Sequence, residues 1–310
     1  MQIISLILNF FLSLSFTNLL IKPFKKVIPD IPNHRSSHKI TKPRGGGIAF
    51  ITSNLITSTF LNHEHFTFLL PLCFLSFIDD IKDINKWFRL IGQISTVIFI
   101  VFSSKNISIL KETSSTNFEI ILVIFISTAI INFCNFMDGI DGILSGLTLV
   151  FLLSATFLIQ NSIWGIIGSV FGFLILNWNP SKIFMGDIGS NFLGSLIVWV
   201  LLNTNSSYNS IGLLFIAAPL LLDPFICLFR RFLNNQKIFD PHSLHLYQRL
   251  TKNGFSHSKV SIIYILASAF ISISFFIGGI TAEILSTLFV LMFGYWLDKR
   301  YASNFHNYHF

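Results

Sequence analysis

The sequence has few charged residues, and this excludes an ordinary soluble domain. Lys, Arg, Asp and Glu make up 11% of the 310 residues, whereas soluble proteins have roughly a quarter. Hydrophobic residues make up 52% of the chain, and the mean hydropathy is +0.69. Apolar stretches recur along the whole length, and most can cover the about 20 residues that cross a bilayer core. The composition therefore predicts an integral membrane protein.

Cysteine is also scarce, and its placement argues against two kinds of site. Cys73, Cys134 and Cys227 each lie in or beside an apolar run, far from one another and without metal-ligand spacing. Cysteines in such places are usually small buried hydrophobic residues. We therefore expect neither a disulfide framework nor a zinc site.

The sequence lacks internal repeats, low-complexity linkers and a second domain, so a single membrane domain is expected over residues 1–310. Residues 1–21 also lack the charged start of a secretory leader, and Lys22, Lys25 and Lys26 follow the apolar run instead of preceding it. This order predicts a retained first helix whose N-terminus lies outside the cell.

Apolar segments can be drawn at eleven places along the chain, and they predict an all-α, multi-pass membrane protein with about 10–11 transmembrane helices. The segments cover approximately residues 1–21, 45–61, 66–79, 90–104, 118–134, 141–160, 162–177, 188–203, 210–229, 259–278 and 282–297.

The charges between these segments are divided unequally. If the loops alternate between two sides, 19 of the 21 Lys and Arg fall on one side, which the positive-inside rule makes cytoplasmic. All ten Asp lie on or near that side, whereas the four Glu lie on the other. The rule says little about acids, so we expect the Asp residues to be functional. The N-terminus is predicted outside, the C-terminus inside and the active site on the cytoplasmic loops.

A basic, glycine-rich stretch is the first polar motif on the cytoplasmic side. Residues 32–38 are followed by Pro43-Arg44-Gly45-Gly46-Gly47. A glycine turn at a helix start can present backbone N–H groups to phosphate, beside the charge of Arg44. The same residues can instead form a positive anchor followed by a flexible hinge, and both interpretations stay open.

Two groups of aspartates follow on the same side. Asp79 and Asp80 are adjacent at a predicted membrane edge, where paired carboxylates are costly unless a cation is near, so they indicate a metal or proton-handling site. A solvated helix end is the alternative. Asp138 and Asp141 lie in the stretch 132–142, close enough to share a helical face. This stretch lacks the long ligand array and terminal Glu of an EF-hand.

The last two motifs lie before and after the ninth apolar segment. Asp187 precedes an apolar helix, where it can face a cation or simply cap the helix. His242, His245 and Arg249 offer donors for a pyrophosphate, or belong to a solvated basic loop. A zinc site is a weak alternative, because no Cys or third His nearby in the sequence completes the pair.

Together these motifs favour one chemistry. Asp carboxylates suit Mg²⁺, which prefers hard oxygen ligands and often binds together with phosphates. Basic loops on the same face suit a diphosphate, and the net charge of +7 fits anionic lipid, nucleotide or phosphate. Nothing in the sequence indicates a nucleic acid partner. We predict a metal-assisted phosphoryl transfer beside the bilayer, with a lipid as one substrate.

The motifs and their order resemble the polyprenyl-phosphate N-acetylhexosamine-1-phosphate transferase family, the bacterial glycosyltransferase family 4. The most specific parts are Asn-Phe-x-Asn-Phe-Met-Asp-Gly-x-Asp-Gly at 132–142 and Phe-Met-Gly-Asp-x-Gly-Ser at 184–190. The resemblance runs from about residue 32 to residue 250. Its last part looks most like the branch that initiates O-antigen and related surface polysaccharides.

The resemblance implies roles for individual residues. Asp79 and Asp80 match a catalytic Asp pair that deprotonates or orients the lipid phosphate near Mg²⁺, and Asp187 matches the principal Mg²⁺ ligand, with Asp80 as a second metal candidate. The other matched positions are Asn135, Asp138 and Asp141 in the nucleotide and diphosphate pocket, Asn177 and Phe184 at the uridine, Arg89 near the phosphates, and His242 and His245 on a catalytic loop at the pocket mouth.

The implied reaction joins a UDP-N-acetylhexosamine, or a deoxy relative, to undecaprenyl phosphate and releases UMP. It would need Mg²⁺, or Mn²⁺ in its place, and would take place in the bacterial inner membrane at the start of lipopolysaccharide or other cell-wall polysaccharide synthesis. A homodimer is left open. Many members carry His-x-His-His-Arg in the last motif, but Tyr247 and Gln248 replace the later two His here, and Ser243 replaces a usual Arg. The sugar therefore stays open.

Two alternatives remain. Within the family, a phospho-N-acetylmuramoyl-pentapeptide transferase is disfavoured by the missing His triplet. From another class, an ion-coupled transporter gains support from Asp223, an ionisable residue inside the ninth apolar segment. A transporter would gather its polar groups near the middle of the membrane, often in repeated halves, whereas here they gather at one face.

Overall fold

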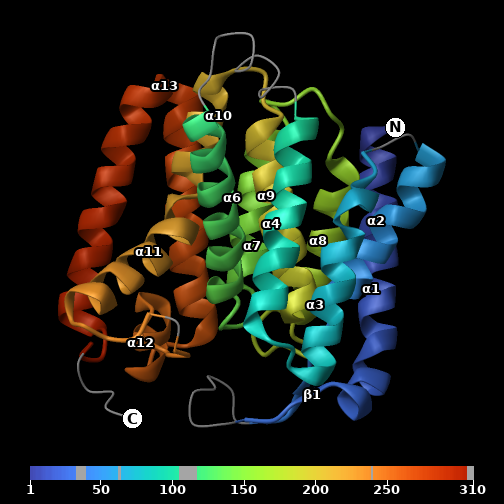
Figure 1. Ribbon diagram of the computed structural model, residues 1–310, viewed down its shortest axis with the longest axis horizontal. Coiled ribbons are helices and arrows are strands. Elements are labelled where there is room, and N and C mark those ends of the chain that lie inside the picture. Colours follow the sequence, from blue (N-terminus) through green and yellow to red (C-terminus); the bar gives the residue numbers. More distant parts are fainter. Residues whose placement is uncertain (33–39, 62–63, 105–116, 239, 306–310) are drawn as a thin grey trace.

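The computed structural model describes the chain apart from residues 33–39, 62–63, 105–116, 239 and 306–310, and the described part is almost entirely helical (Figure 1). The described helices are α1 (Gln2–Val27), α2 (Gly47–Leu61), α3 (Leu70–Lys82), α4 (Lys86–Ser103), α6 (Asn117–Met137), α7 (Ile143–Ala155), α8 (Trp164–Asn177), α9 (Gly186–Leu202), α10 (Ser207–Ile216), α11 (Ala218–Leu233), α12 (Leu246–Lys252) and α13 (His257–Tyr301). The 3₁₀ helix η1 (Phe66–Leu69) precedes α3, and the short strands β1 (Pro29–Asp30) and β2 (Lys42–Pro43) pair antiparallel.

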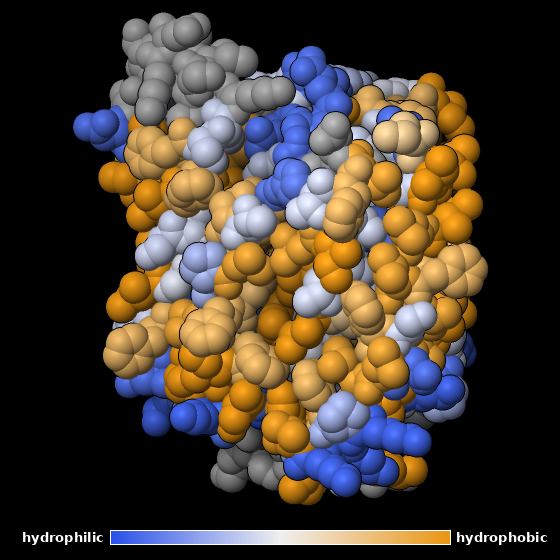
Figure 2. All heavy atoms as spheres, turned by 90° about the vertical axis from the view of Figure 1, so that its right-hand side faces the viewer, coloured by the Kyte–Doolittle hydropathy of each residue, from blue (hydrophilic) through white to orange (hydrophobic). Residues whose placement is uncertain are grey.

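The long helices run back and forth between two ends of the molecule. Figure 1 shows the chain beginning at the upper end, while β1, α12 and the last described residues lie at the lower end. Figure 2 shows hydrophobic side chains over the middle of the face formed by α1 and α2, with hydrophilic ones gathered at the two ends. This pattern is typical of a protein whose middle lies in lipid, and it confirms the prediction of an all-α membrane protein.

Four described helices, namely α1, α4, α6 and α13, are long and apolar enough to cross a membrane, or five if the bent pair α10–α11 forms one span. The helices α2, α7, α8 and α9 are shorter and apolar. They too coincide with predicted segments. The number of crossings and their orientation stay predictions.

Three predicted segments depart from simple spans. The ninth breaks between α10 and α11, whose axes differ by 68°. The last two are joined as α13, which folds back at Gly279 (φ 64°, ψ −161°), a backbone conformation that suits glycine (Figure 1). At this break the freed N–H of Ile280 donates to Tyr208 Oη at 3.0 Å.

Small and polar residues bring α1, α2 and α8 together. A Cβ on Gly168 would lie 2.2 Å from the Leu6 carbonyl oxygen, so only glycine allows this approach. At the same seam, Asn9 Oδ1 accepts hydrogen bonds from Thr57 at 2.8 Å and Ser169 at 3.0 Å. Close backbone contact and interhelical hydrogen bonds replace hydrophobic burial as the cohesive forces between helices in lipid.

The helix α9 is the central element of the molecule. Its residues from Ile188 to Leu201 are all buried, and it packs against α2, α3, α4 and α6. The N-terminus of α9 therefore lies at the lower end of the molecule, among the ends of these neighbouring helices. It is there that Asp187 begins the candidate site.

Candidate active site

The glycine-rich stretch crosses closely over the segment that leads into α9. The N–H groups of Gly46 and Gly47 donate to the carbonyl oxygens of Phe184 and Met185, both at 2.9 Å. A Cβ on Gly47 would lie only 2.4 Å from the Cα of Gly189. These two N–H groups are therefore engaged by the backbone and are not free donors for a phosphate, and the glycines permit close packing. Residues 33–39 of the same motif lie outside the described part.

Asp80 fixes the start of α9. Its Oδ1 accepts the N–H of Asp187 at 3.1 Å, and its Oδ2 accepts the N–H of Ile188 at 3.2 Å. A carboxylate in this place satisfies free helix donors and complements the helix dipole. Burial, and then the negative charge of Asp187, raise the pKa of Asp80 to about 7. A cation near these carboxylates would lower that pKa again.

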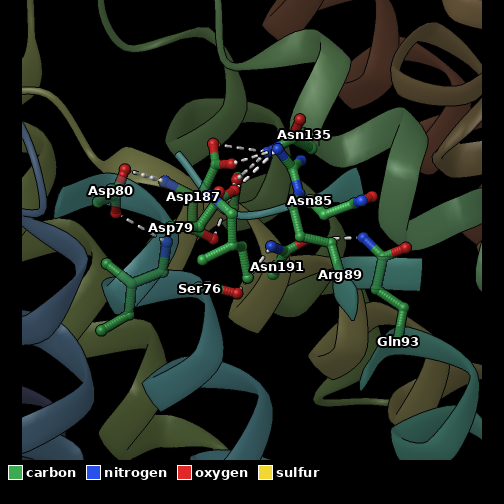
Figure 3. A network of polar contacts seen from close by, with 12 residues as sticks. Ser76, Asp79, Asp80, Asn85, Arg89, Gln93, Asn135, Asp187 and Asn191 are labelled. Atoms are coloured by element: carbon green, nitrogen blue, oxygen red, sulfur yellow. Dashed lines mark hydrogen bonds and ion pairs between the residues drawn. The ribbon is translucent and has the colours of Figure 1, made fainter. Parts of the chain in front are cut away.

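Arg89 bridges two carboxylates in front of α9 (Figure 3). Its Nη1 lies 2.8 Å from Asp79 Oδ2 and 3.1 Å from Asp187 Oδ2. Asn135 donates its Nδ2–H to Asp187 Oδ1 at 3.0 Å. The Asp187 side chain is 30% exposed, against 6% for Asp79 and 1% for Asp80. Asp187 is thus the carboxylate of this group most open to a ligand from solution.

A chain of amide and hydroxyl side chains lies one helical turn from these charged residues, toward the middle of the molecule. Gln93 donates to Asn191 Oδ1 at 3.1 Å and accepts from Asn132 at 2.9 Å, and Asn191 donates to Ser76 at 2.8 Å (Figure 3). Gln93 lies on α4, Asn191 on α9, Asn132 on α6 and Ser76 on α3. Each is three or four residues along its helix from a charged or amide residue of the site. Sequence reasoning gave no role to Asn191 or Ser76, although polar side chains inside apolar helices were the available signal.

Asp141 anchors a second group beside the first. Ser181 donates to it through both its hydroxyl, at 2.8 Å, and its N–H, at 3.1 Å, and Lys42 Nζ lies 3.5 Å from Oδ1. His257 Nδ1 lies 3.4 Å from Oδ2. Burial by itself would raise the pKa of Asp141, but the hydrogen bonds from His257 and Ser181 and the charge of Lys42 lower it to about 2. Lys42 Nζ also lies 5.0 Å from the centre of the Phe184 ring.

Asp138 and Asn177 complete this part of the site. Limited access to water, followed by the charges of Asp187, Asp80 and Asp141, raises the pKa of Asp138 well above its usual value. Asn177 is buried, donates to the Ile183 carbonyl oxygen at 3.1 Å and accepts from Ser145 at 3.0 Å. Its amide thus holds the loop that carries Phe184.

The His-bearing loop forms a third group. Asp223 accepts the N–H of Leu246 at 2.8 Å and of Tyr247 at 3.1 Å, and the hydroxyl of Tyr264 at 2.6 Å. Asp223 therefore anchors the start of α12. This role explains why an ionisable residue lies in an apolar segment, and it does not require ion transport. Tyr247 Oη in turn donates to the Phe136 carbonyl oxygen at 2.7 Å, which ties this loop to the end of α6.

Arg249 lies apart from the carboxylates of Asp79, Asp80 and Asp187. It is buried, donates to the carbonyl oxygens of Leu244 at 3.0 Å and Ser303 at 2.9 Å, and pairs with Asp298. Its contacts hold the end of α13 against α12. The structure thus keeps Arg249 in a separate cluster. It brings together the other charged and amide residues, namely Asp79, Asp80, Arg89, Asn135 and Asp187. Arg44 donates to the Asp80 carbonyl oxygen, and the Asp141 group lies beside them.

The first group has the donor set that a magnesium ion requires. Mg²⁺ prefers a few carboxylate oxygens together with water and substrate phosphate oxygens. Asp187 offers oxygens open to solvent, next to Asp79 and with Asp80 directly behind. The residues therefore fit a divalent cation held mainly by Asp187.

Comparison with known proteins identifies the family. Residues 65–205 match Glycosyl transferase family 4. A Bacillus subtilis protein named probable undecaprenyl-phosphate N-acetylglucosaminyl 1-phosphate transferase is 30% identical over 304 residues, which cover 87% of this chain and 84% of that protein. The chain belongs to glycosyl transferase family 4. This family 4 protein is therefore a membrane-bound transferase of substituted phosphate groups, and the transporter alternative is wrong.

Other relatives carry names that specify the same activity. The undecaprenyl-phosphate alpha-N-acetylglucosaminyl 1-phosphate transferase of Escherichia coli K12 is 28% identical over 281 residues, covering 81% of this chain and 77% of the relative. The protein of that name from Yersinia pestis is 26% identical over 322 residues, covering 93% and 88%. The similarity thus extends over nearly the whole length of this family 4 transferase.

Proposed function

We propose that this family 4 transferase moves an N-acetylhexosamine-1-phosphate, or a deoxy relative, from a UDP-sugar to undecaprenyl phosphate and releases UMP. The observation that carries the proposal is the bridging of Asp79 and Asp187 by Arg89 at the N-terminus of the central helix α9. This group lies at the end of apolar helices, where a lipid phosphate and a soluble nucleotide can meet. The named activities of the relatives support the same acceptor and the same type of group transfer.

In the proposed reaction, an oxygen of the lipid phosphate forms a bond to the β-phosphorus of the UDP-sugar. The bond from that phosphorus to the bridging oxygen breaks, and UMP leaves with the oxygen. Asp79 lies beside Arg89, where it can orient the lipid phosphate or accept its proton. A direct transfer of this kind needs no covalent enzyme intermediate.

A magnesium ion, or manganese in its place, would be held by Asp187 with Asp79 and Asp80 and would neutralise the diphosphate charge. Arg89 would shift from bridging carboxylates toward the phosphates. Arg44 supports an anionic ligand in the same place, because its buried Nε finds no hydrogen-bond partner among the described residues and lies 3.8 Å from Asp80 Oδ1. A buried guanidinium donor without a partner is costly unless a ligand satisfies it.

The Asp141 group would hold the nucleotide. Phe184 offers an aromatic face, and the buried carboxylate of Asp141 holds Ser181, Lys42 and His257 in place beside it. Asn135 and Asp138 lie between this group and Asp187. The uridine would bind beside the carboxylates and direct its diphosphate toward Asp187.

The physiological setting is proposed from the resemblance to the branch that initiates O-antigen synthesis. We place the enzyme in the bacterial plasma membrane, at the first lipid-linked step of a cell-surface polysaccharide such as an O-antigen. UDP-N-acetylglucosamine is the first donor to test, since the relatives' names specify that sugar. Because the His-bearing loop departs from the common family pattern, a galacto epimer or a 6-deoxy sugar is also included.

The test uses purified protein in detergent with Mg²⁺, undecaprenyl phosphate and a panel of UDP-sugars. UMP release is measured, and the lipid product is identified by mass spectrometry. The proposal expects UMP only when lipid and a suitable UDP-sugar are both present, together with a lipid diphosphate sugar. UMP formation without the lipid would indicate a hydrolase, and no UMP with any donor would contradict the proposal.

A further inference from the structure

A cysteine and two histidines meet beneath the start of α12. Cys227 comes from α11, while His242 and His245 come from the loop that precedes α12. One potential ligand atom of each residue lies within 4.8 Å of the other two. The two imidazole rings lie 4.9 Å apart, centre to centre. These residues are 15 and 18 positions from the cysteine, so the fold brings together what the sequence keeps apart.

This cluster is shielded from water. Cys227 and His245 are each 3% exposed, and His242 is half-buried. Within the part of the chain that the structure describes, the buried Nδ1 of His245 finds no hydrogen-bond partner, and it lies 3.9 Å from Asp223 Oδ1. An unsatisfied polar atom in a buried place is uncommon and calls for an explanation such as an ion.

The chemical state of the two histidines suits a metal. Burial first, and then nearby positive groups including Arg231, lower the pKa of both His242 and His245 to about 3. Both imidazoles are therefore neutral near pH 7 and keep a lone pair for a metal. The charge of Arg231 opposes a cation, but its guanidinium donates to the carbonyl oxygens of the loop, and a Cys227 thiolate would offset it.

We propose that Cys227, His242 and His245 bind a transition-metal ion of intermediate softness, for which Zn²⁺ is the best match. Zn²⁺ takes thiolate and imidazole ligands, and three protein ligands leave a fourth position for water or another oxygen. This site differs in ligand type from the Asp79–Asp187 group, whose oxygens suit Mg²⁺. It goes beyond the proposed function and does not rest on it.

The bound ion would fasten the loop before α12 to α11. Metal binding stabilises a fold when the ligands come from separate segments, because the site does not exist in the unfolded chain. Here one ligand lies on α11 and two lie on the loop. The simpler alternative is a packed cluster without metal, in which Cys227 joins Leu244 and Phe305 as a small apolar group.

The experiment uses the full chain, purified in detergent without a histidine tag, treated with a chelator and then kept throughout in excess Mg²⁺, so that the Asp79–Asp187 group is already occupied. Zn²⁺ is titrated against a chromophoric chelator, and Co²⁺ is added separately because its thiolate charge-transfer band reports a metal–sulfur bond. We expect one equivalent of metal and a Co²⁺–thiolate band in the wild type. Cys227→Ser should abolish the band, whereas the matched control Cys73→Ser, at another buried free cysteine, should retain it.

Thermal unfolding gives an independent measurement. Zn²⁺ at 100 times its dissociation constant should raise the Tm of the wild type and of Cys73→Ser by roughly 5–10 °C, and should leave that of Cys227→Ser unchanged. The absence of a thiolate band in the wild-type protein would overturn the proposal, whatever the variants do. A band and Tm shift that persist in Cys227→Ser would overturn it as well, because the metal would then be bound elsewhere.

Discussion

Replacement of Arg89 by Gln removes the positive charge that joins two of the three clustered carboxylates. In the structure, Arg89 Nη1 lies 2.8 Å from Asp79 and 3.1 Å from Asp187. A glutamine is shorter and neutral, so it cannot maintain either ion pair. Asp79 and Asp187 would then face each other with no bridging cation, and their repulsion would act against the folded arrangement of α3 and α9.

The size of this effect follows from the two contacts. A hydrogen bond to a charged group contributes about 1.5–3 kcal/mol. Because the Arg89 side chain is 29% exposed, water screens part of the attraction, and the lower end applies. Losing both contacts should therefore cost about 2–3 kcal/mol. At roughly 2–4 °C per kcal/mol, the Tm should fall by roughly 4–12 °C.

The assay is thermal unfolding of the Arg89→Gln protein in detergent, with chelator and again with Mg²⁺. We expect the full decrease in chelator and a partial recovery with Mg²⁺, since a divalent cation bound by Asp187 would balance the charges that Arg89 leaves. Lys82→Gln is the matched control: it removes a positive charge at the exposed end of α3, and its Tm should stay within about 1 °C of the wild type.

Two results would refute this reasoning about charge balance. If Arg89→Gln melts at the wild-type temperature in chelator, the guanidinium does not hold the carboxylates together. If the Tm falls but Mg²⁺ restores nothing, the carboxylates do not form the cation site that their convergence indicates.

Other changes probe different parts of the structure. Asn191→Leu leaves two buried partners unsatisfied and should lower stability by about 2–4 kcal/mol, seen as a lower Tm; an unchanged Tm would mean that the amide chain is unimportant. Gly139→Ala places a Cβ 2.0 Å from Tyr247 Oη, so UMP release should fall at least about tenfold. Adding Tyr247→Phe to this variant removes the hydroxyl and should partly restore UMP release. Full activity of Gly139→Ala alone would contradict this. Asn253 and Asn205 are exposed, and the charge asymmetry places them on opposite sides of the membrane, so a cysteine at Asn253 should be labelled from the cytoplasmic side and one at Asn205 from the external side. The native cysteines are buried and should not be labelled. Labelling of both introduced cysteines from one side would contradict the topology.

The sequence could predict which polar residues gather, because their positions follow from helix ends. Asp79, Asp138 and Asp187 each lie near the end of an apolar stretch, and charge asymmetry assigned all three ends to one side. The structure brings these ends together at the N-terminus of α9. The helices themselves could also be predicted, because a long apolar run in a membrane has few alternatives to a helix.

Contacts between distant segments could not be predicted in this way. The role of the glycines at 45–47 depends on the carbonyl groups of Phe184 and Met185, which no local pattern reveals. Cys227 was expected to be a plain apolar residue, because no local pattern shows that the loop before α12 brings two histidines next to it. The contribution of Asn191 likewise depends on partners from two other helices.

The measurement that tests the central claim most directly is UMP release by Asp187→Asn over a range of Mg²⁺ concentrations. The amide keeps the shape of the side chain and its contact with Asn135 but loses the charge that would hold the metal. Asp83→Asn is the control, an exposed aspartate in the left-handed conformation (φ 46°), which asparagine also tolerates. The account predicts more than a tenfold loss of turnover at every Mg²⁺ concentration, at least about 1.4 kcal/mol of transition-state stabilisation, with near wild-type turnover in the control. Turnover of Asp187→Asn within tenfold of the wild type would contradict the assignment of this carboxylate group as the active site.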